Sequence, residues 1–222
     1  HSRSRRQRQM CIRDSCMRDS DIDTKQYSPK RIQAHISSLK NQRILPGEAV
    51  EFAQSFFDVK VAEIYSSYQK KLMLANSMDF DDLLIKAVEL LETSDKSLNY
   101  WSSKFQYIMI DEYQDTNMVQ YRLVELLASK HKNICVVGDS DQSIYAFRGA
   151  DIRNIEEFES DFKNAKVISL EKNYRSSQKI LDIANAVISN NPRKKDKKLW
   201  TDNDEGLDCL LYTSPSPRDV NR

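Results

Sequence analysis

Two adjacent carboxylates, Asp111 and Glu112, follow directly on the apolar run Tyr107–Ile110. Such a pair could divide the work of phosphoryl transfer between its members. One carboxylate can hold a hydrated Mg²⁺, because this hard cation prefers oxygen ligands. The other can orient or deprotonate a water that attacks a phosphoryl group. An Asp-Glu dipeptide can equally be a solvated loop that starts a helix, so the pair alone leaves both interpretations open.

Two further apolar runs also end in polar loops. Ile134–Val137 precedes the loop 138–150, and Val167–Leu170 precedes the loop 171–177. A short continuous apolar run is typical of a strand that is buried on both faces of a parallel sheet. Ligands of such sheets bind beyond the carboxyl ends of the strands. The sequence therefore predicts three buried strands, each followed by a loop that could carry chemistry.

Outside the predicted strands, apolar residues recur at helical spacing. The helical segments start near Ser28, Phe52, Asp79, Met118, Asp151 and Ser177. Asp79 is an expected N-cap, and the Asp residues of the first turn after it suit the positive end of the helix dipole. The aromatic residues between Phe52 and Leu72 could stack on bases, although helical spacing favours packing in a core. Alternating strands and helices predict an α/β fold with a mostly parallel sheet and helices on both of its faces.

The composition bounds the class of protein. Hydrophobic residues make up 40% of the 222 residues and charged residues 30%, which suits a soluble domain with a core. No apolar run approaches the ~20 residues that a membrane span needs, and no signal-peptide pattern occurs, so we expect no membrane partner. The four cysteines have neither disulfide-like nor zinc-like spacing, which favours a reducing cytoplasm. Cys135, inside a predicted strand, is expected to be a small buried hydrophobe.

The two ends of the chain differ from the rest. Residues 1–19 contain six Arg and two Asp but almost no apolar periodicity, and residues 209–222 offer no apolar face either. The basic segment could be an arm for nucleic-acid phosphates, or it could be sequence that is not native to the protein. We favour the second interpretation for both ends. Residues 1–20 are expected to be disordered, residues 209–222 to be a tail, and neither to have a function.

Three long motifs make the chain resemble the UvrD/Rep/PcrA-type DNA helicases of superfamily 1. Asp111-Glu-Tyr-Gln-Asp-Thr-Asn117 resembles their Walker B motif. The segment 138–150, Gly-Asp-Ser-Asp-Gln-Ser-Ile-Tyr-Ala-Phe-Arg-Gly-Ala, resembles their third motif, and Leu170-Glu-Lys-Asn-Tyr-Arg-Ser-Ser177 resembles their fourth. The resemblance covers about Asp21 to Gly206. It implies a RecA-like P-loop NTPase motor domain and part of a helical inserted subdomain.

The resemblance also implies a division of the chain into domains. Residues 21–77 are expected to be part of the helical inserted subdomain, and residues 78–165 part of the first RecA-like motor domain. Residues 166–208 are expected to start the second RecA-like motor domain.

ATP and Mg²⁺ are the cofactors that the resemblance implies. Asp111 would hold Mg²⁺ through water, and Glu112 would handle the attacking water. Gln142 would sense the γ-phosphate, because an amide offers both a donor and an acceptor; the alternative is that it only stabilises its loop. Arg175, expected in the second domain, would reach the γ-phosphate as an arginine finger does; the alternative is a surface salt bridge.

Tyr145 and Phe147 are the residues expected to bind DNA by stacking on bases, which is tolerant of sequence. Arg148 would pair with a backbone phosphate. The alternative for either ring is burial in the domain core. The expected partners are single-stranded DNA and DNA duplex junctions; no protein partner is predicted.

A P-loop needs the pattern G-x-x-x-x-G-K-[ST], and none of the four glycines (47, 138, 149 and 206) precedes a lysine. We therefore expect an internal piece of a helicase, inactive by itself. The parent is expected to be a cytoplasmic, nucleoid-associated ATP-dependent 3′–5′ DNA helicase of a bacterium. Two alternatives remain open: an ATPase-dead scaffold that binds single-stranded DNA, and the motor part of a helicase–nuclease subunit.

Overall fold

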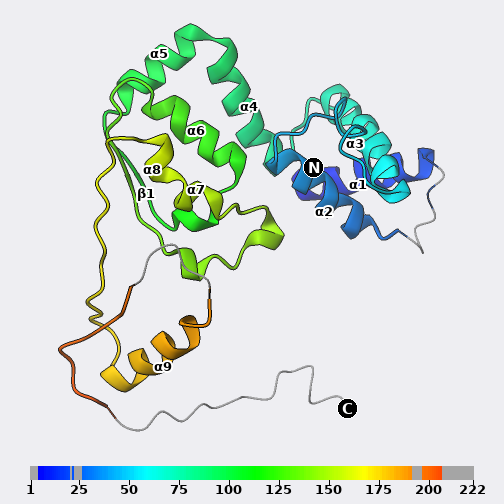
Figure 1. Cartoon of the computed structure of the whole chain (residues 1–222). Helices are drawn as coiled ribbons and strands as arrows, with labels where there is room; N and C mark the ends of the chain where they lie inside the picture. Colours follow the sequence, from blue (N-terminus) through cyan, green and yellow to red (C-terminus); the bar gives the residue numbers. More distant parts are fainter. Residues whose placement is uncertain (1–4, 21, 23–26, 192–196, 207–222) are drawn as a thin grey trace, which may run out of the picture. The chain divides into compact units, whose positions relative to one another are not determined.

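The computed structural model describes residues 5–20, 22, 27–191 and 197–206. The chain divides into two compact units, residues 1–158 and residues 159–222 (Figure 1). None of the helices in the described part is long and apolar enough to cross a membrane.

Helices α1 (Arg5–Asp19), α2 (Pro29–Asn41) and α3 (Phe56–Leu74) form one cluster of the first unit (Figure 1). Two local signals set the helix starts. Ser28 accepts the Arg31 N–H and is followed by Pro29, and Ser55 accepts the Asp58 N–H. The buried core of the cluster comprises Cys16, Met17, Ile32, Ile36, Ala49, Val61, Ala62, Ile64, Tyr65, Tyr68 and Leu72. From Phe57 onward the aromatic stripe of α3 packs in or against this core, as its spacing favours, whereas Phe52, before the helix, and Phe56 are exposed.

The expectation of a disordered segment over residues 1–20 is wrong for Arg5–Asp19. Cys16 and Met17 of α1 are completely buried against α2 and α3. Arg13 is also buried, and its guanidinium donates to Gln33 of α2 (Nη1–Oε1 2.6 Å) and to the adjacent Asp14. Two or three apolar side chains on one face are enough to attach a short helix to an existing core, even where the sequence around them is mostly charged.

Helices α4 (Phe80–Thr93), α5 (Asp95–Lys104) and α6 (Met118–Ala128) form a second apolar cluster. Its buried residues are Val88, Leu91, Val119 and Leu126. The expected N-cap is confirmed: Asp79 accepts the Asp82 N–H, and the Asp82 side chain accepts the Asp79 N–H, so both residues form a capping box. Asn117 and Gln120 form the same arrangement at the start of α6.

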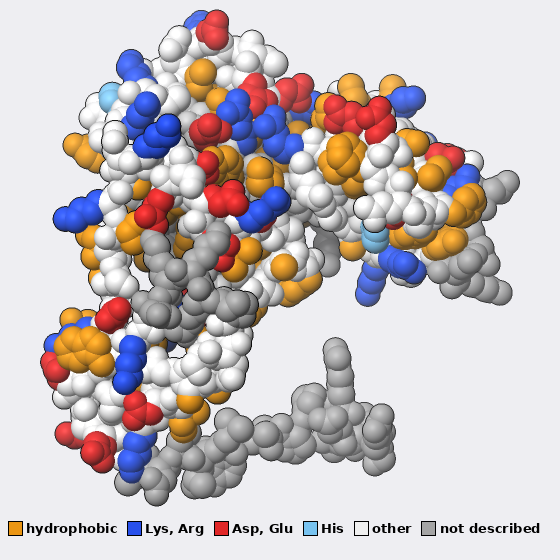
Figure 2. Space-filling view, viewed as in Figure 1, with side chains coloured by type: hydrophobic (Ala, Val, Ile, Leu, Met, Phe, Trp, Pro, Cys, Tyr) orange, Lys and Arg blue, Asp and Glu red, His pale blue; other side chains and the backbone are white. Residues whose placement is uncertain are grey.

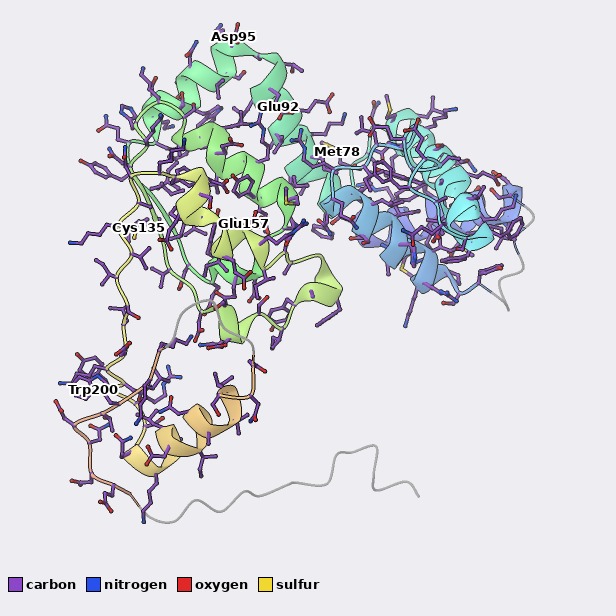
Figure 3. All side chains as sticks on the ribbon, viewed as in Figure 1. Met78, Glu92, Asp95, Cys135, Glu157 and Trp200 are labelled. Carbon is purple, nitrogen blue, oxygen red and sulfur yellow. The ribbon has the colours of Figure 1, made fainter. Side chains whose placement is uncertain are left out.

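Strands β1 (Ile108–Ile110) and β2 (Ile134–Val136) form a two-stranded parallel sheet with α6 in the connection between them. Two of the predicted strands are therefore confirmed, but their burial on both faces is not. Met109 pairs in register with Cys135, so the two side chains share a face. Met109 is 78% exposed and Cys135 is also exposed (Figure 3), because only the opposite face is covered. The prediction of a buried Cys135 is wrong for this reason.

The predicted third strand, Val167–Leu170, is not a strand in the structure. Val167, Ile168 and Leu170 are exposed. In the described part of the second unit the only strand-like pairing is an isolated bridge between Lys172 and Trp200, so the apolar run has no neighbouring strand to bond with. The helix of this unit that follows the fourth motif, α9 (Gln178–Ile188), begins after Ser177, as predicted.

The helix expected over residues 151–162 is also interrupted. It is replaced by two single turns, α7 (Arg153–Glu156) and α8 (Phe158–Asp161), with Glu157 between them. The observed fold is a largely helical α/β structure with a small parallel sheet.

Candidate functional site: a carboxylate loop and an aromatic turn

The carboxylate loop, residues Asp111–Asn117, leaves the end of β1. Both Asp111 and Glu112 are exposed there, and the Glu112 N–H donates to Asp111 Oδ1 (2.9 Å). Glu112 has φ 50° and ψ 43°, the left-handed conformation. For a residue other than glycine this conformation costs on the order of 1–3 kcal/mol, and such strain concentrates at functional sites. The loop therefore presents its two carboxylates to solvent at a strained turn.

Gln114 joins the carboxylate loop to the loop after β2, although sequence reasoning did not single it out. Its buried side chain donates through Nε2 to Glu112 Oε2 (2.7 Å). Its Oε1 accepts the Asp139 N–H (3.0 Å). A Cβ on Gly138 would lie 2.6 Å from that same Oε1, so the glycine is required by the close approach of the two loops. A buried amide that links two loops leaves no periodic signal in a sequence.

Gln142 lies in the turn η2 (Ser140–Gln142), one step further along this network. Its exposed side chain donates through Nε2 to Asp139 Oδ2 (2.9 Å). Asp139 Oδ1 accepts the Asp141 N–H (3.0 Å), which holds the turn closed. The structure thus connects Gln142 to Glu112 through Asp139 and Gln114. Its role as a sensor of the γ-phosphate stays a prediction.

The aromatic turn, residues Tyr145–Gly149, follows η2 and contains the turn η3 (Ala146–Arg148). Phe147 is 78% exposed, which removes the core alternative for this ring. The ring of Tyr145 is partly buried, with its centroid 5.9 Å from that of Phe147 and the two planes at 43°. The Arg148 side chain lies outside the described part of the chain, so its expected phosphate contact stays a prediction.

Arg175 belongs to the second unit. It lies in an exposed turn where Asn173 Oδ1 accepts the N–H groups of Arg175 (2.9 Å) and Ser176 (2.8 Å). The other site residues named from the sequence all belong to the first unit. The role of Arg175 as an arginine finger therefore stays a prediction.

A buried ionic cluster, formed by Lys40, Asp79 and Asp82, lies at the start of α4. Lys40 Nζ lies 2.7 Å from Asp79 Oδ2 and 2.7 Å from Asp82 Oδ1. Tyr68 and Gln69 of α3 donate to the same two oxygens (3.1 and 3.0 Å). Burial, and next the charge of Asp79, raise the pKa of Tyr68 far above its ordinary value. Sequence reasoning did not identify this cluster, because nothing local marks a lysine 39 and 42 residues away as the partner of the two aspartates.

The residues present fit a hydrated Mg²⁺ better than a fully protein-bound metal. Among the described residues there is no group of three or more His, Cys, Asp or Glu that could hold a metal ion. Mg²⁺ typically keeps several waters and takes one or two carboxylates, and Asp111 offers one exposed carboxylate at a strand end.

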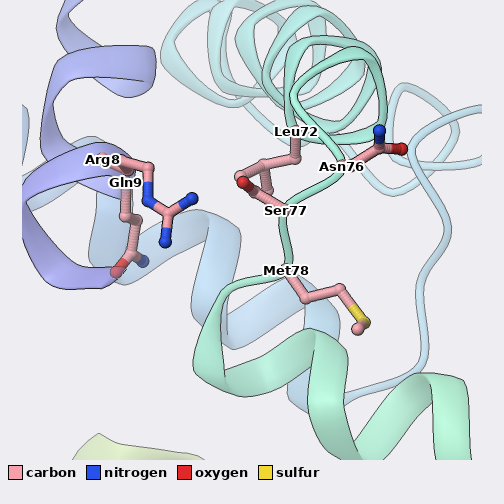
Figure 4. A pocket seen from close by; sticks show the side chains of 6 residues that line it. All are labelled: Arg8, Gln9, Leu72, Asn76, Ser77 and Met78. Atoms are coloured by element: carbon pink, nitrogen blue, oxygen red, sulfur yellow. The ribbon is translucent and has the colours of Figure 1, made fainter. Parts of the chain in front are cut away.

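A hollow in the surface, shown in Figure 4, is lined by Arg8, Gln9, Leu72, Asn76, Ser77 and Met78. None of its lining residues comes from the carboxylate loop or the aromatic turn. We therefore do not assign the nucleotide to it.

Comparisons with known proteins identify the family. Residues 2–163 match the model of the UvrD/REP helicase N-terminal domain. The chain belongs to the UvrD/REP helicase family. Residues 168–221 also match the model of the UvrD-like helicase C-terminal domain. These matches confirm the resemblance seen in the motifs, and their ranges extend into both end segments of the chain.

Curated relatives in this family are ATP-dependent DNA helicases named PcrA. The chain is 48% identical over 204 residues to PcrA of Bacillus subtilis (strain 168), which covers 92% of the chain and 28% of the relative. It is 48% identical over 203 residues to PcrA of Staphylococcus aureus (strain Mu50), which covers 91% of the chain and 28% of the relative. The chain thus spans 28% of the length of these relatives.

Proposed function

We propose that the protein to which this chain belongs is an ATP-dependent DNA helicase. It would move 3′ to 5′ on single-stranded DNA and unwind duplex at junctions. The observation that carries the proposal is the hydrogen-bonded path Glu112–Gln114–Asp139–Gln142, which connects a strand-end carboxylate pair to the segment that leads into the exposed aromatic turn. A motor needs such a connection between the site of ATP hydrolysis and the site of DNA contact.

On this proposal the chain comprises parts of two RecA-like motor domains and of a helical insertion. Residues 21–77 would belong to the insertion, residues 78–165 to the first motor domain and residues 166–208 to the second. The parallel pair β1 and β2, with α6 between them, supports the assignment of residues 78–165, because parallel strands with helical crossovers build such domains. The site of action would be the bacterial cytoplasm, where the DNA lies.

Phosphoryl transfer depends mainly on positioning and electrostatic stabilisation. Bound Mg²⁺ would neutralise charge on the phosphate oxygens. Asp111 would position the metal through water, and Glu112 would orient the attacking water and take its proton. Gln142 would contact the γ-phosphate, and Arg175 would approach it from the second motor domain.

Contact with DNA would rest on the aromatic turn. Phe147 offers an exposed ring and Tyr145 a second, partly buried ring beside it, and stacking is worth about 1–3 kcal/mol per base. Arg148 would add a phosphate contact. Over the described part of the first unit, the face shown in Figure 2 has acidic and basic side chains intermixed rather than a single basic band.

The test measures whether the full-length protein unwinds matched duplexes that carry a 3′ tail, a 5′ tail or no tail. Strand separation should require Mg²⁺ and ATP and should occur with the 3′-tailed duplex. Tight binding of single-stranded DNA without ATP turnover would instead support the scaffold alternative. Shortened DNA products would support a helicase–nuclease subunit.

A further inference from the structure

We propose that Asn41 is a positioning residue that holds the aromatic turn against the carboxylate loop, and that it thereby sets how strongly DNA stimulates ATP turnover. The inference rests on the proposed function and adds a residue that lies outside all three motifs. Asn41 is the last residue of α2, yet its side chain is buried between two motif segments that follow it by 76 and 108 positions in the sequence.

The first contact is with the end of the carboxylate loop. Asn117 Nδ2 donates to Asn41 Oδ1 (2.9 Å), and both side chains are buried. The orientation of the Asn117 amide is fixed independently, because its Oδ1 accepts the Gln120 N–H (2.9 Å) at the start of α6. Asn117 must therefore offer its NH₂ group to Asn41, and Asn41 must present an acceptor.

The second contact is with the end of the aromatic turn. Gly149 has φ 89°, and a Cβ built there would lie 3.0 Å from Asn41 Cβ and 3.1 Å from Asn41 Nδ2. Gly149 therefore faces the Asn41 side chain at close range, with no room for a side chain of its own between them. The Gly149 N–H also donates to Ala146 O (2.9 Å) and closes the turn that presents Phe147. A displacement of the turn must consequently move Gly149 against Asn41.

Thr116, the neighbour of Asn117, provides a second connection between the carboxylate loop and the segment that follows the aromatic turn. Its carbonyl oxygen accepts the Asp151 N–H (2.9 Å) and the Asn154 side-chain amide (3.0 Å). The aromatic turn is thus held to the carboxylate loop directly behind Gly149 as well as through Asn41. Asn41 is the member of this arrangement that comes from α2, ahead of both loops in the sequence.

Asn41 itself has rigid support on both sides. The preceding residue, Lys40, is fixed in the buried ionic cluster. Two residues further on, Arg43 bonds Glu92 of α4 (2.7 Å), and Arg122 of α6 bonds the other oxygen of Glu92 (2.7 Å). Burial raises the pKa of Glu92, but the bond from Arg122 and the charge of Arg43 outweigh burial and leave the pKa below its ordinary value. The residues next to Asn41 are therefore anchored to α4 and, through Glu92, to α6, the helix that begins at the end of the carboxylate loop.

The arrangement predicts that Asn41 couples DNA contact at the aromatic turn to ATP turnover at the carboxylate loop, in addition to stabilising the fold. Changes along a packed, hydrogen-bonded connection between two sites alter their coupling by about twofold to thirtyfold. Truncation of the Asn41 side chain at Cβ removes the acceptor of Asn117 together with the Cγ and Nδ2 atoms beside Gly149. We expect the factor by which DNA stimulates ATP turnover to fall about threefold to tenfold, within that range.

The experiment measures kcat and KM for ATP in the full-length protein, with and without single-stranded DNA, for four single variants and one double variant. Asn41→Ala removes the acceptor for Asn117 and the Cγ and Nδ2 atoms beside Gly149, and keeps the Cβ. Asn117→Ser keeps a helix N-cap of equal quality but no longer reaches Asn41. Asn41→Asp keeps the acceptor for Asn117 but places a charge at a buried position, so it should lower the free energy of unfolding while the stimulation factor stays within about twofold of wild type. Asn99→Ala, on the exposed surface of α5, is the control and should leave the ratio unchanged.

Asn41→Ala and Asn117→Ser should each lower the stimulation factor. The double variant should have a factor no lower than that of Asn41→Ala, because both single variants remove the same hydrogen bond between Asn117 and Asn41. A merely destabilised protein would lose stimulated and unstimulated turnover in proportion and keep the ratio. An unchanged ratio in Asn41→Ala would overturn the inference. If the wild type shows no DNA-stimulated turnover, the proposed function itself fails, which is a separate outcome.

Discussion

Replacement of Lys40 by methionine should strongly destabilise the first unit. The Lys40 side chain is 0% exposed, and those of Asp79 and Asp82 are each 2% exposed. Methionine fills a similar volume but supplies no charge, so two carboxylates would remain buried without their cation. Removal of one partner from a buried ion pair typically costs about 3–5 kcal/mol, because the remaining charge is not compensated.

The structure favours the lower end of that range. Four neutral donors still bond the two carboxylates after the substitution: the Tyr68 hydroxyl (3.1 Å), the Gln69 amide (3.0 Å) and the N–H groups of Asp82 (2.8 Å) and Asp79 (3.1 Å). We therefore expect a loss of about 3 kcal/mol in the free energy of unfolding. With a urea m-value of about 1–3 kcal/mol/M, the unfolding midpoint should fall by roughly 1–3 M.

The assay is urea unfolding followed by circular dichroism, with Lys86→Met as the matched control. Lys86 pairs with Glu89 one turn away on α4, and both side chains are about half exposed, so its loss should cost less than about 0.5 kcal/mol. The triple variant with Asp79→Asn and Asp82→Asn should recover part of the stability, because no charge is left uncompensated. A Lys40→Met midpoint as little changed as that of Lys86→Met would refute the argument.

Three further substitutions have expected outcomes, and for two of them the chain offers a matched control substitution. Gly138→Ala should lower the free energy of unfolding by at least about 1 kcal/mol, because the added Cβ would lie too close to Gln114 and Ile155. In the control Gly47→Ala, the added Cβ would have no atom within 4 Å, so the free energy of unfolding should stay the same or rise by up to about 1 kcal/mol. Phe147→Ala should weaken binding of single-stranded DNA by the full-length protein by about 1–3 kcal/mol in a fluorescence-anisotropy titration. Met17→Ala should lower the free energy of unfolding by about 2–4 kcal/mol, while Met10→Ala on the exposed side of α1 should change it little.

Each of these predictions has an outcome that contradicts it. Equal stability of the two glycine variants would show that the loops can separate without cost. Unchanged DNA affinity in a folded Phe147→Ala variant would remove the stacking role. Equal stability of the two methionine variants would show that α1 does not pack as the structure has it.

Local features of the fold were readable from the sequence. The position of Asp111 and Glu112 after a strand, the parallel pairing of that strand with Ile134–Val136 and the N-cap at Asp79 all depend on short stretches of chain. The third predicted strand failed because an apolar run indicates only a tendency, whereas a strand also needs a neighbour to bond with. Helix α1 was missed because its few apolar residues make almost no periodic signal among the charged ones.

The parts of the site that sequence reasoning missed depend on contacts between distant segments. The linking role of Gln114 depends on the loop after β2, whose Asp139 N–H donates to it, and the motif alone does not indicate this contact. Lys40 and Asn41 lie outside every motif and acquire their roles only when α2 packs against α4 and the two loops. The left-handed conformation of Glu112 likewise has no sequence signal, since residues other than glycine rarely adopt it.

The most direct test of the account is ATP turnover by the full-length Glu112→Gln variant in the presence of single-stranded DNA, measured together with its affinity for Mg·ATP. Glutamine keeps the size of the side chain and an acceptor for Gln114, but it removes the base that would take a proton from water. Turnover should fall by about 10²–10⁴-fold, while nucleotide affinity stays within a few-fold of wild type. Glu125→Gln, at an exposed ion pair of α6, should leave both unchanged. Turnover by Glu112→Gln within a few-fold of wild type would contradict the central claim that the carboxylate loop is the site of ATP hydrolysis.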